Sequence, residues 1–132
     1  MQISVEYIDK LINEAIDARE NAYAPYSKFK VGAVVIDEKG NHYRGCNVEN
    51  GSYGLTNCGE RTAIFNAISN GMKTINIIIV VADTSIPVSP CGACRQVMKE
   101  FSTENTLIIL SNLKKEYKIM TIEEILPYGF KL

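Results

Sequence analysis

The spacing of apolar residues near the start of the chain predicts an amphipathic helix. Between Ser4 and Asn21, apolar side chains recur at steps of three and four residues, and no Gly or Pro interrupts them. The apolar positions are Ile8, Leu11, Ile12, Ala15 and Ala18. We expect this helix to end before Ala24-Pro25.

Two segments rich in β-branched and small apolar residues follow the helix, Val31–Ile36 and His42–Val48. Residues 37–41 between them contain the Asp, Gly and Asn that are typical of a hairpin loop, so we expect two antiparallel strands. After a polar loop over residues 50–56, the segment Thr62–Ile68 predicts a short helix that Gly71 ends.

The second half of the chain adds three strands and two helices. Ile75–Ala82 is almost entirely Ile and Val, which is typical of a central strand buried on both faces. Ser89-Pro90 favours a helix start, because proline suits the first helical position, and the helix is expected over 91–101. The remaining expected elements are strands at Thr106–Leu110 and Tyr117–Met120 and a short helix with a capping box at Thr121–Glu124.

The resulting element order, αββαβαββα, predicts an α/β fold in which a mixed five-stranded sheet lies inside a three-layer α/β/α sandwich. A length of 132 residues suits one continuous core, so we expect a single domain over residues 1–132. With 46% hydrophobic residues, the chain also lacks the polar bias of disordered proteins.

The charge balance narrows the possible partners. A formal net charge of −1 and a pI of about 5.8 provide no excess of Lys and Arg for nucleic acid or anionic membranes. The longest apolar run, Ile77–Ala82, is far shorter than the roughly 20 residues that span a bilayer, and Met1–Tyr7 has no leader pattern. We therefore expect a cytoplasmic protein with neither a nucleic-acid nor a membrane partner.

Four cysteines suggest metal or redox chemistry in such a protein. Cys91 and Cys94 form a CxxC pair at a predicted helix start, where exposed N–H groups and the helix dipole favour thiolates. The pair alone is compatible with thiol–disulfide exchange, structural zinc or catalytic zinc. Cys46 lies inside a predicted strand, and we interpret it as an inert, buried side chain.

A second motif favours catalytic zinc. Cys58 stands at another predicted helix start, and Glu60 follows two residues later. Three sulfurs on one Zn²⁺ ion leave the fourth tetrahedral position for water. Cys-x-Glu combined with Pro-Cys-x-x-Cys matches the signature of zinc deaminases, in which the Glu is the general acid and base. Taken alone, Glu60 would also suit a helix cap after Asn57.

Three thiolates give a Zn²⁺ centre a net charge of −1, which holds the pKa of its water high unless a cation compensates. Arg61 is the candidate, donating to a thiolate from outside the ligand set, although an ordinary surface arginine is the alternative. His42, the only histidine, stands beside the hairpin turn, and we expect it to be solvated.

Four motifs in order resemble the small, homotetrameric cytidine deaminases over nearly the whole chain. They are Tyr26–Ala33, Asn47–Asn50, Cys58–Arg61 and Pro90–Gln96. The resemblance implies the α/β/α fold predicted above, one Zn²⁺ per chain, and conversion of free cytidine and deoxycytidine to uridine and deoxyuridine in pyrimidine salvage. A nucleoside substrate agrees with the low pI.

The resemblance also implies substrate contacts. Asn47 and Glu49 correspond to the pair that binds the sugar 3′-hydroxyl, and Phe29 to an aromatic lining the pocket. Gly59 would contribute backbone contacts to the base, at a position more often occupied by alanine. Phe130 resembles a C-terminal aromatic that enters a neighbouring subunit's active site, and Tyr53 would lie at the subunit contacts.

Other functions remain open from the residues. Within the deaminases, the alternative is an enzyme for a cytosine-containing antibiotic such as blasticidin S, and a deoxycytidylate substrate would need a cationic site that the sequence does not identify. From another class come a CxxC thiol–disulfide protein and a structural zinc site with all four cysteines.

Overall fold

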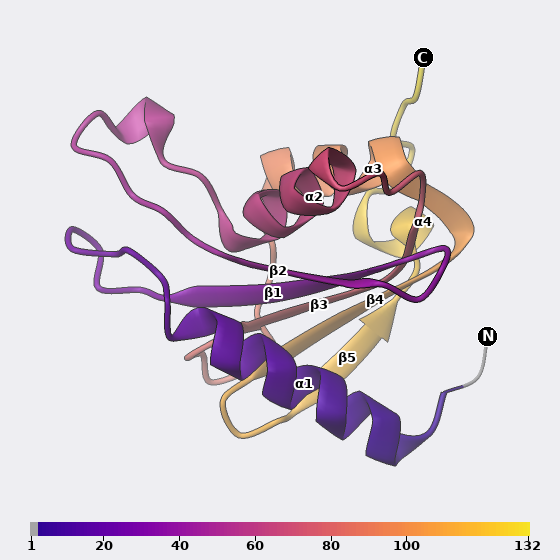
Figure 1. The fold of residues 1–132 in the computed structure, drawn as a ribbon, viewed down its shortest axis with the longest axis horizontal. Helices are drawn as coiled ribbons and strands as arrows, with labels where there is room; N and C mark the ends of the chain where they lie inside the picture. Colours follow the sequence, from indigo (N-terminus) through magenta and orange to yellow (C-terminus); the bar gives the residue numbers. More distant parts are fainter. Residues whose placement is uncertain (1–2) are drawn as a thin grey trace.

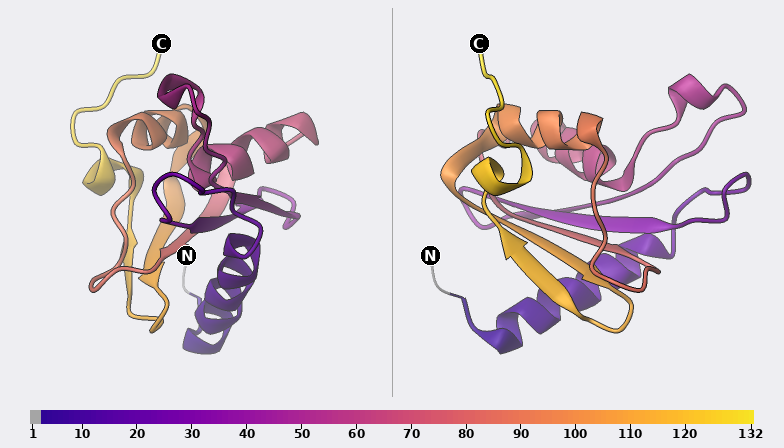
Figure 2. Two further views of the ribbon diagram at one scale, coloured as in Figure 1. Left: turned by 90° about the vertical axis from the view of Figure 1, so that its left-hand side faces the viewer. Right: turned by 180° about the vertical axis from the view of Figure 1, so that it is seen from behind.

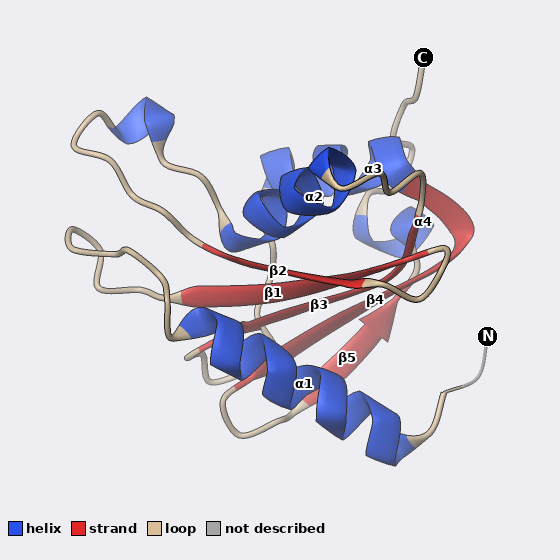
Figure 3. Cartoon of the chain, viewed as in Figure 1, coloured by secondary structure: helices blue, strands red, loops and turns tan. Residues whose placement is uncertain are grey.

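The computed structural model describes residues 3–132; Met1 and Gln2, which begin the Met1–Tyr7 segment named above, lie outside the described residues. The elements are α1 (Val5–Arg19), β1 (Val31–Asp37), β2 (His42–Cys46), the 3₁₀ turn η1 (Tyr53–Leu55), α2 (Gly59–Ser69), β3 (Ile75–Ala82), α3 (Gly92–Phe101), β4 (Ser102–Asn112), β5 (Tyr117–Met120) and α4 (Ile122–Ile125). Their order confirms the predicted αββαβαββα arrangement (Figure 3).

The five strands form one mixed sheet in the order β2-β1-β3-β4-β5. β1 pairs antiparallel with both β2 and β3, β3 pairs parallel with β4, and β5 pairs antiparallel with β4. The register places Ala33 beside Val80 and Ile79 beside Ile109, so the central strand β3 lies between two other apolar strands. The prediction of a mixed five-stranded sheet is therefore confirmed.

Helices cover both faces of the sheet, which makes the three predicted layers (Figures 1 and 2). α1 packs on one face, with Leu11 and Ile12 against Ile79. α2, α3 and α4 cover the other face, where Ile64 and Met98 pack over the sheet. Burial of each such side chain contributes about 1.5–3 kcal/mol, so the two apolar clusters hold the layers together.

Two strand ends differ from the prediction. β2 ends at Cys46 instead of Val48. Asn47 N still donates to Val31 O at 3.2 Å, but the Val31 N–H donates to the Asn47 side chain at 2.8 Å, and the Asn47 carbonyl accepts the Tyr23 N–H at 3.0 Å instead. Val48 then forms isolated bridges to Tyr23 and Asn57 and leaves the sheet. β4 begins at residue 102, four residues before the predicted start, and pairs with the beginning of β3.

Glycine allows α2 to lie directly on the edge strand β2. A Cβ atom on Gly45 would meet the backbone nitrogen of Ala63, on α2, at 2.2 Å. A real Cβ atom does not tolerate such a distance, so only glycine permits this approach. The close contact sets the position of α2, which carries Cys58 at its N-cap.

Among residues 3–132, no helix has both the length and the apolar character needed to cross a membrane.

Candidate active site

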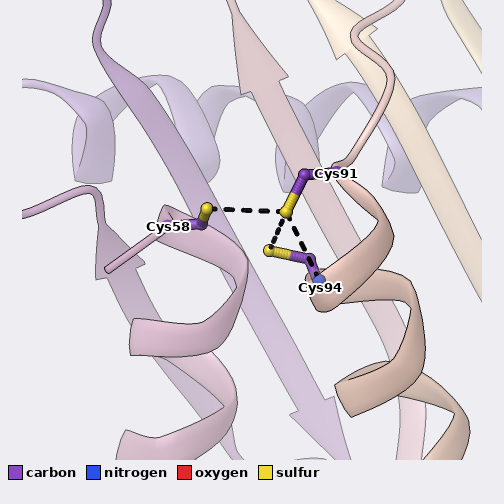
Figure 4. A group of neighbouring side chains, drawn as sticks. All are labelled: Cys58, Cys91 and Cys94. Carbon is purple, nitrogen blue, oxygen red and sulfur yellow. Dashed lines mark hydrogen bonds between the residues drawn. The ribbon is translucent and has the colours of Figure 1, made fainter. Parts of the chain in front are cut away.

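The N-termini of α2 and α3 lie side by side and bring three cysteines together (Figure 4). Cys58 is the N-cap of α2, Cys91 is the N-cap of α3, and Cys94 lies in the first turn of α3. Their sulfurs lie within 4.8 Å of one another, with 3.8 Å between Cys58 and Cys91 and 3.3 Å between Cys91 and Cys94. Tetrahedral Zn–S bonds of about 2.3 Å require sulfurs about 3.8 Å apart, so the three residues fit one zinc ion.

Within residues 3–132, the group able to hold a metal ion consists of these three cysteines and includes no fourth residue. Cys46 is outside it, on the edge strand β2. The side chain of Cys46 is half-buried and not fully buried as expected, because the edge strand leaves it partly open, and the burial that remains raises its thiol pKa.

Proton sharing among the sulfurs suits metal binding. The pKa of the Cys58 thiol is lowered to about 5, first by the hydrogen bond from Cys94 and then by the Arg61 guanidinium, although burial opposes the shift. The pKa of Cys94 is raised, because its thiol donates this hydrogen bond and is buried. A metal ion that binds all three sulfurs therefore displaces protons from the group.

Arg61 lies against the ligand group as the sequence predicted. Its Nη2 donates to the sulfur of Cys58 at 3.2 Å, and its Nε is buried without a hydrogen-bond partner in the described structure. The neighbouring thiolate raises the pKa of Arg61, so the guanidinium stays charged. The position favours charge compensation over an ordinary surface role.

Glu60 is buried one residue into α2, with 4% of its surface exposed. Burial raises the pKa of its carboxyl group, and the charge on Cys58 raises it further. Cys58, Cys91 and Glu60 all line one cavity of about 240 Å³, so the carboxyl group faces the same space as two of the sulfurs.

The rest of this cavity contains several predicted residues and several that the sequence did not reveal. Phe29, Asn47 and Glu49 were predicted. The additional lining residues are Ser27, Val31, Thr56, Val88 and Ser89. Ser27 and Val31 lie inside the Tyr26–Ala33 motif and Ser89 directly precedes the Pro90–Gln96 motif, which was the available signal. None of the lining residues is a Lys or Arg.

Asn47 and Glu49 hold the loop that carries Phe29. The Asn47 side chain accepts from Val31 N at 2.8 Å and donates to Phe29 O at 2.7 Å. Glu49 accepts the backbone N–H of Tyr26 at 3.0 Å and also a hydrogen bond from the Ser27 hydroxyl. The Ser27 hydroxyl, followed by the backbone N–H groups, holds the pKa of Glu49 below its ordinary value. Each side chain keeps spare hydrogen-bonding capacity for a ligand.

Gly59, predicted to contact the base, is not among the residues that line this cavity, but it packs against two of them: an added Cβ would lie 3.0 Å from Val31 O and 3.4 Å from Asn47 N. An alanine at this position would therefore require a small shift of β1 or residue 47.

Phe130 and Tyr53 do not line this chain's cavity. Phe130 is 66% exposed near the C-terminus, and Tyr53 is 78% exposed on the projecting loop before α2, with its ring 6.3 Å from that of Tyr26. His42 is not simply solvated: its Nδ1 lies 2.8 Å from a carboxylate oxygen of Glu14 on α1.

The fold and the three-sulfur group are those of a zinc-binding deaminase, and comparison with known proteins agrees. Residues 5–110 match the family model described as the cytidine and deoxycytidylate deaminase zinc-binding region. Cytidine deaminase from Halalkalibacterium halodurans is 54% identical over 91% of this chain and 91% of its own, and that of Sporosarcina psychrophila is 51% identical over 93% and 90%. The crystal structure of cytidine deaminase from Burkholderia pseudomallei superposes with a TM-score of 0.90 at 44% identity, covering 97% of this chain and all of that one. The chain belongs to the cytidine and deoxycytidylate deaminase family.

Proposed function

We propose that this protein hydrolyses free cytidine and deoxycytidine to uridine and deoxyuridine, with release of ammonia. One observation carries the proposal: three sulfurs suited to one zinc ion lie beside a buried carboxyl group in a cavity without cationic side chains. Similarity to cytidine deaminases over most of the chain supports the same reaction.

In the proposed site, Cys58, Cys91 and Cys94 hold the zinc ion and Arg61 compensates the excess negative charge. A bound zinc ion supplies a Lewis acid that makes the attacking water more acidic. Glu60 takes a proton from that water and delivers it to N3 of the cytosine ring as the water oxygen bonds to C4. Glu60 then takes the proton of the new C4 hydroxyl group and delivers it to the amine nitrogen, so that the C4–N bond breaks, the C4 oxygen becomes the carbonyl of uridine, and ammonia leaves.

The raised pKa of Glu60 suits this double task. A carboxyl group whose pKa lies nearer to neutrality both accepts and returns a proton readily. Burial is the largest cause that raises the pKa, and it is present before substrate arrives.

The cavity favours a nucleoside over a nucleotide. Phe29 offers an apolar wall for the base, and Asn47 and Glu49 offer polar atoms for sugar hydroxyls. A 5′-phosphate would find no Lys or Arg in the lining, and the ionised Glu49 would repel it. We therefore expect cytidine to be a better substrate than deoxycytidylate, although the family's description names deaminases of both.

The assay is direct. Purified holoenzyme incubated with cytidine, deoxycytidine or deoxycytidylate should form uridine or deoxyuridine and ammonia from the two nucleosides, and a zinc chelator should stop the reaction. Turnover of deoxycytidylate at a higher kcat/KM than cytidine would overturn the nucleoside assignment. A cytosine-containing antibiotic serves as a further substrate, and preferential turnover of it would support the alternative deaminase.

We further propose a homotetramer in which Phe130 completes the active site of a neighbouring subunit. Phe130 is exposed and does not line the cavity of its own chain, and an exposed aromatic near a chain end needs a partner surface to hold it. Tyr53 and Leu55, 78% and 70% exposed on the loop before α2, provide apolar surface for subunit contacts. Light scattering should give four chains per particle.

A free-nucleoside substrate also supports a cytoplasmic role in pyrimidine salvage. Cell fractionation with an antibody to the protein tests the location.

A further inference from the structure

Arg95 donates hydrogen bonds to two segments that lie far apart in the sequence. It stands on α3 directly after Cys94, and its Nε donates to the carbonyl oxygen of Pro90 at 2.9 Å while its Nη2 donates to the Ser89 hydroxyl at 2.7 Å. Its Nη1 donates to the carbonyl oxygen of Ile125, the last residue of α4, at 2.8 Å. One guanidinium therefore joins the loop before α3 to the end of α4.

The hydrogen bonds from Arg95 to Ser89 and Pro90 affect the position of a metal ligand. Cys94 is fully buried and fixed by packing, and the sulfur of Cys58 accepts a hydrogen bond from Arg61. Cys91 is exposed, so apart from the Cys94 N–H that its sulfur accepts at 3.4 Å, its position depends on the backbone that leads into it. The carbonyl of Pro90 belongs to the peptide group that enters Cys91, and the bond from Arg95 holds the plane of that peptide.

The hydrogen bond from Arg95 to Ile125 holds the start of the C-terminal segment. α4 has four residues, and the Ile125 carbonyl lies in its last turn, where carbonyl groups lack helical partners. Arg95 supplies the missing donor. The next residue of α3, Gln96, donates its side-chain N–H to Phe130 O at 3.3 Å. Two consecutive residues of α3 therefore hold the chain from Ile125 to Phe130.

We propose that Arg95 is a positioning residue that fixes the Cys91 backbone and the C-terminal segment in one arrangement, and so couples the metal site to the segment carrying Phe130. Only a planar group with several donors satisfies these acceptors together, and the single ammonium of lysine does not replace it. The consequence for catalysis rests on the proposed function, in which Phe130 serves a neighbouring subunit.

Zinc release and amide hydrogen exchange test the coupling without substrate. For holoenzyme, zinc release into a chromogenic chelator and exchange over residues 122–130 are compared between the wild type, Arg95→Gln and Arg95→Lys. Loss of groups that orient metal ligands weakens metal binding by roughly 10- to 100-fold, so Arg95→Gln should release zinc faster by about that factor. The same variant should exchange faster over 122–130, and Arg95→Lys should lie between it and the wild type.

Matched variants separate the coupling from general loss of stability. Gln96→Ala should speed exchange near Phe130 and leave zinc release unchanged. Arg44→Gln removes another arginine bond to a backbone carbonyl, that of Glu14 at 3.1 Å, and should change neither readout. Ile109→Val, in the core on the opposite face of the sheet, shows what reduced stability alone does to zinc release.

Several outcomes would overturn the proposal. They are unchanged zinc release in both Arg95 variants, faster release without faster exchange over 122–130, and equal release from an Ile109→Val protein of the same melting temperature. If Arg95→Gln does not fold, Arg95→Lys decides between these outcomes. Zinc release and amide exchange can both be measured in a protein that does not deaminate cytidine. Failure of the proposed function is therefore distinguishable from failure of the Arg95 proposal.

Discussion

The Nη2 atom of Arg61 lies 3.2 Å from the sulfur of Cys58, one turn earlier at the N-cap of α2. The contact places a permanent positive charge on the ligand group from the same helix that supplies one ligand. The charge is held close to the sulfur by this hydrogen bond, and the Nε atom of the half-buried Arg61 lies out of reach of solvent.

Replacing Arg61 should change the acidity of Cys58 in the metal-free protein. The pKa of this thiol is about 5, so loss of the cation in Arg61→Gln should raise it and move Cys58 alkylation by iodoacetamide to higher pH. Cys94→Ala should move it further, because the Cys94 hydrogen bond is the largest cause of the shift. Mass spectrometry of alkylated Cys58 against pH measures both changes, and Arg44→Gln serves as a control. Superimposable profiles would contradict the assigned causes.

Glu60→Gln should separate metal binding from turnover. The amide is nearly the same size, so the zinc content measured by mass spectrometry should stay at one ion per chain. Turnover of cytidine should fall by about 10²–10⁴-fold, the usual contribution of a general acid and base. Wild-type kcat in a zinc-loaded variant would remove Glu60 from the mechanism.

Ser27→Ala should weaken substrate binding more than it slows the chemical step. The Ser27 hydroxyl bonds Glu49 and accepts the N–H of Phe29 at 3.0 Å, so its loss loosens two lining residues. We expect KM for cytidine to rise several-fold with a smaller change in kcat. Ser52→Ala, in the same region but with no side-chain bond at its helix cap, should leave both constants unchanged. A fall in kcat alone would contradict this role.

Asp37 should make the hairpin sensitive to acid. Its Oδ1 accepts the backbone N–H groups of Lys39 at 2.9 Å and Asn41 at 2.8 Å, and its Oδ2 accepts from the Asn41 side chain. Burial would raise the pKa of this carboxyl group, but the hydrogen bonds from Asn41 and Lys39 outweigh burial and hold it below its ordinary value of 3.8. The folded state therefore favours the carboxylate, and the stabilisation is present above about pH 4 and lost as the pH falls below that value.

Asp37→Asn tests this stabilisation by urea unfolding. The variant should lose about 1–2 kcal/mol at pH 7, because its amide donates where Oδ2 accepted. The difference from the wild type should shrink below pH 4, where the wild-type carboxyl group also takes up a proton. A difference that does not depend on pH would assign the effect to packing.

Mixing two variants of reduced activity tests whether Phe130 acts between subunits. Phe130→Ala should lower kcat/KM while zinc content stays unchanged, because the ring does not line its own chain's cavity. When Phe130→Ala chains are dissociated and reassembled with Glu60→Gln chains, some sites regain both groups from different subunits. Activity should therefore reappear in the mixture. Absence of recovery in verified mixed oligomers would place Phe130 in its own subunit.

The order of the elements was predictable because it depends on local signals, and the meeting of the sulfurs was predictable because Cys-x-Glu with Pro-Cys-x-x-Cys matches the signature of zinc deaminases. Cys58 and Cys91 each stand at a helix start that the sequence marks, and a pattern of three ligands with a nearby Glu is uncommon by chance. The ends of β2 and β4 were not predictable, because side-chain bonds such as that from Val31 N to Asn47 decide where pairing stops.

The sequence also did not reveal much of the cavity lining. Val88 and Thr56 reach it through loops whose course depends on bonds between distant residues, such as Glu49 with Ser27. The pair of His42 and Glu14 escaped prediction for the same reason, since 28 residues separate them and only the packing of α1 on the sheet brings them together.

Gly45, on the edge strand β2, helps to set the positions of the three sulfurs relative to one another. At this position β2 lies directly against the backbone and Cβ of Ala63 on α2, so any larger residue would push the helix outward. Cys58 would travel with the helix, whereas Cys91 and Cys94 belong to another helix and would stay. The distance between the Cys58 sulfur and the other two sulfurs therefore depends on Gly45, which contacts none of them. A substitution on the edge strand would enlarge the site for a larger ion.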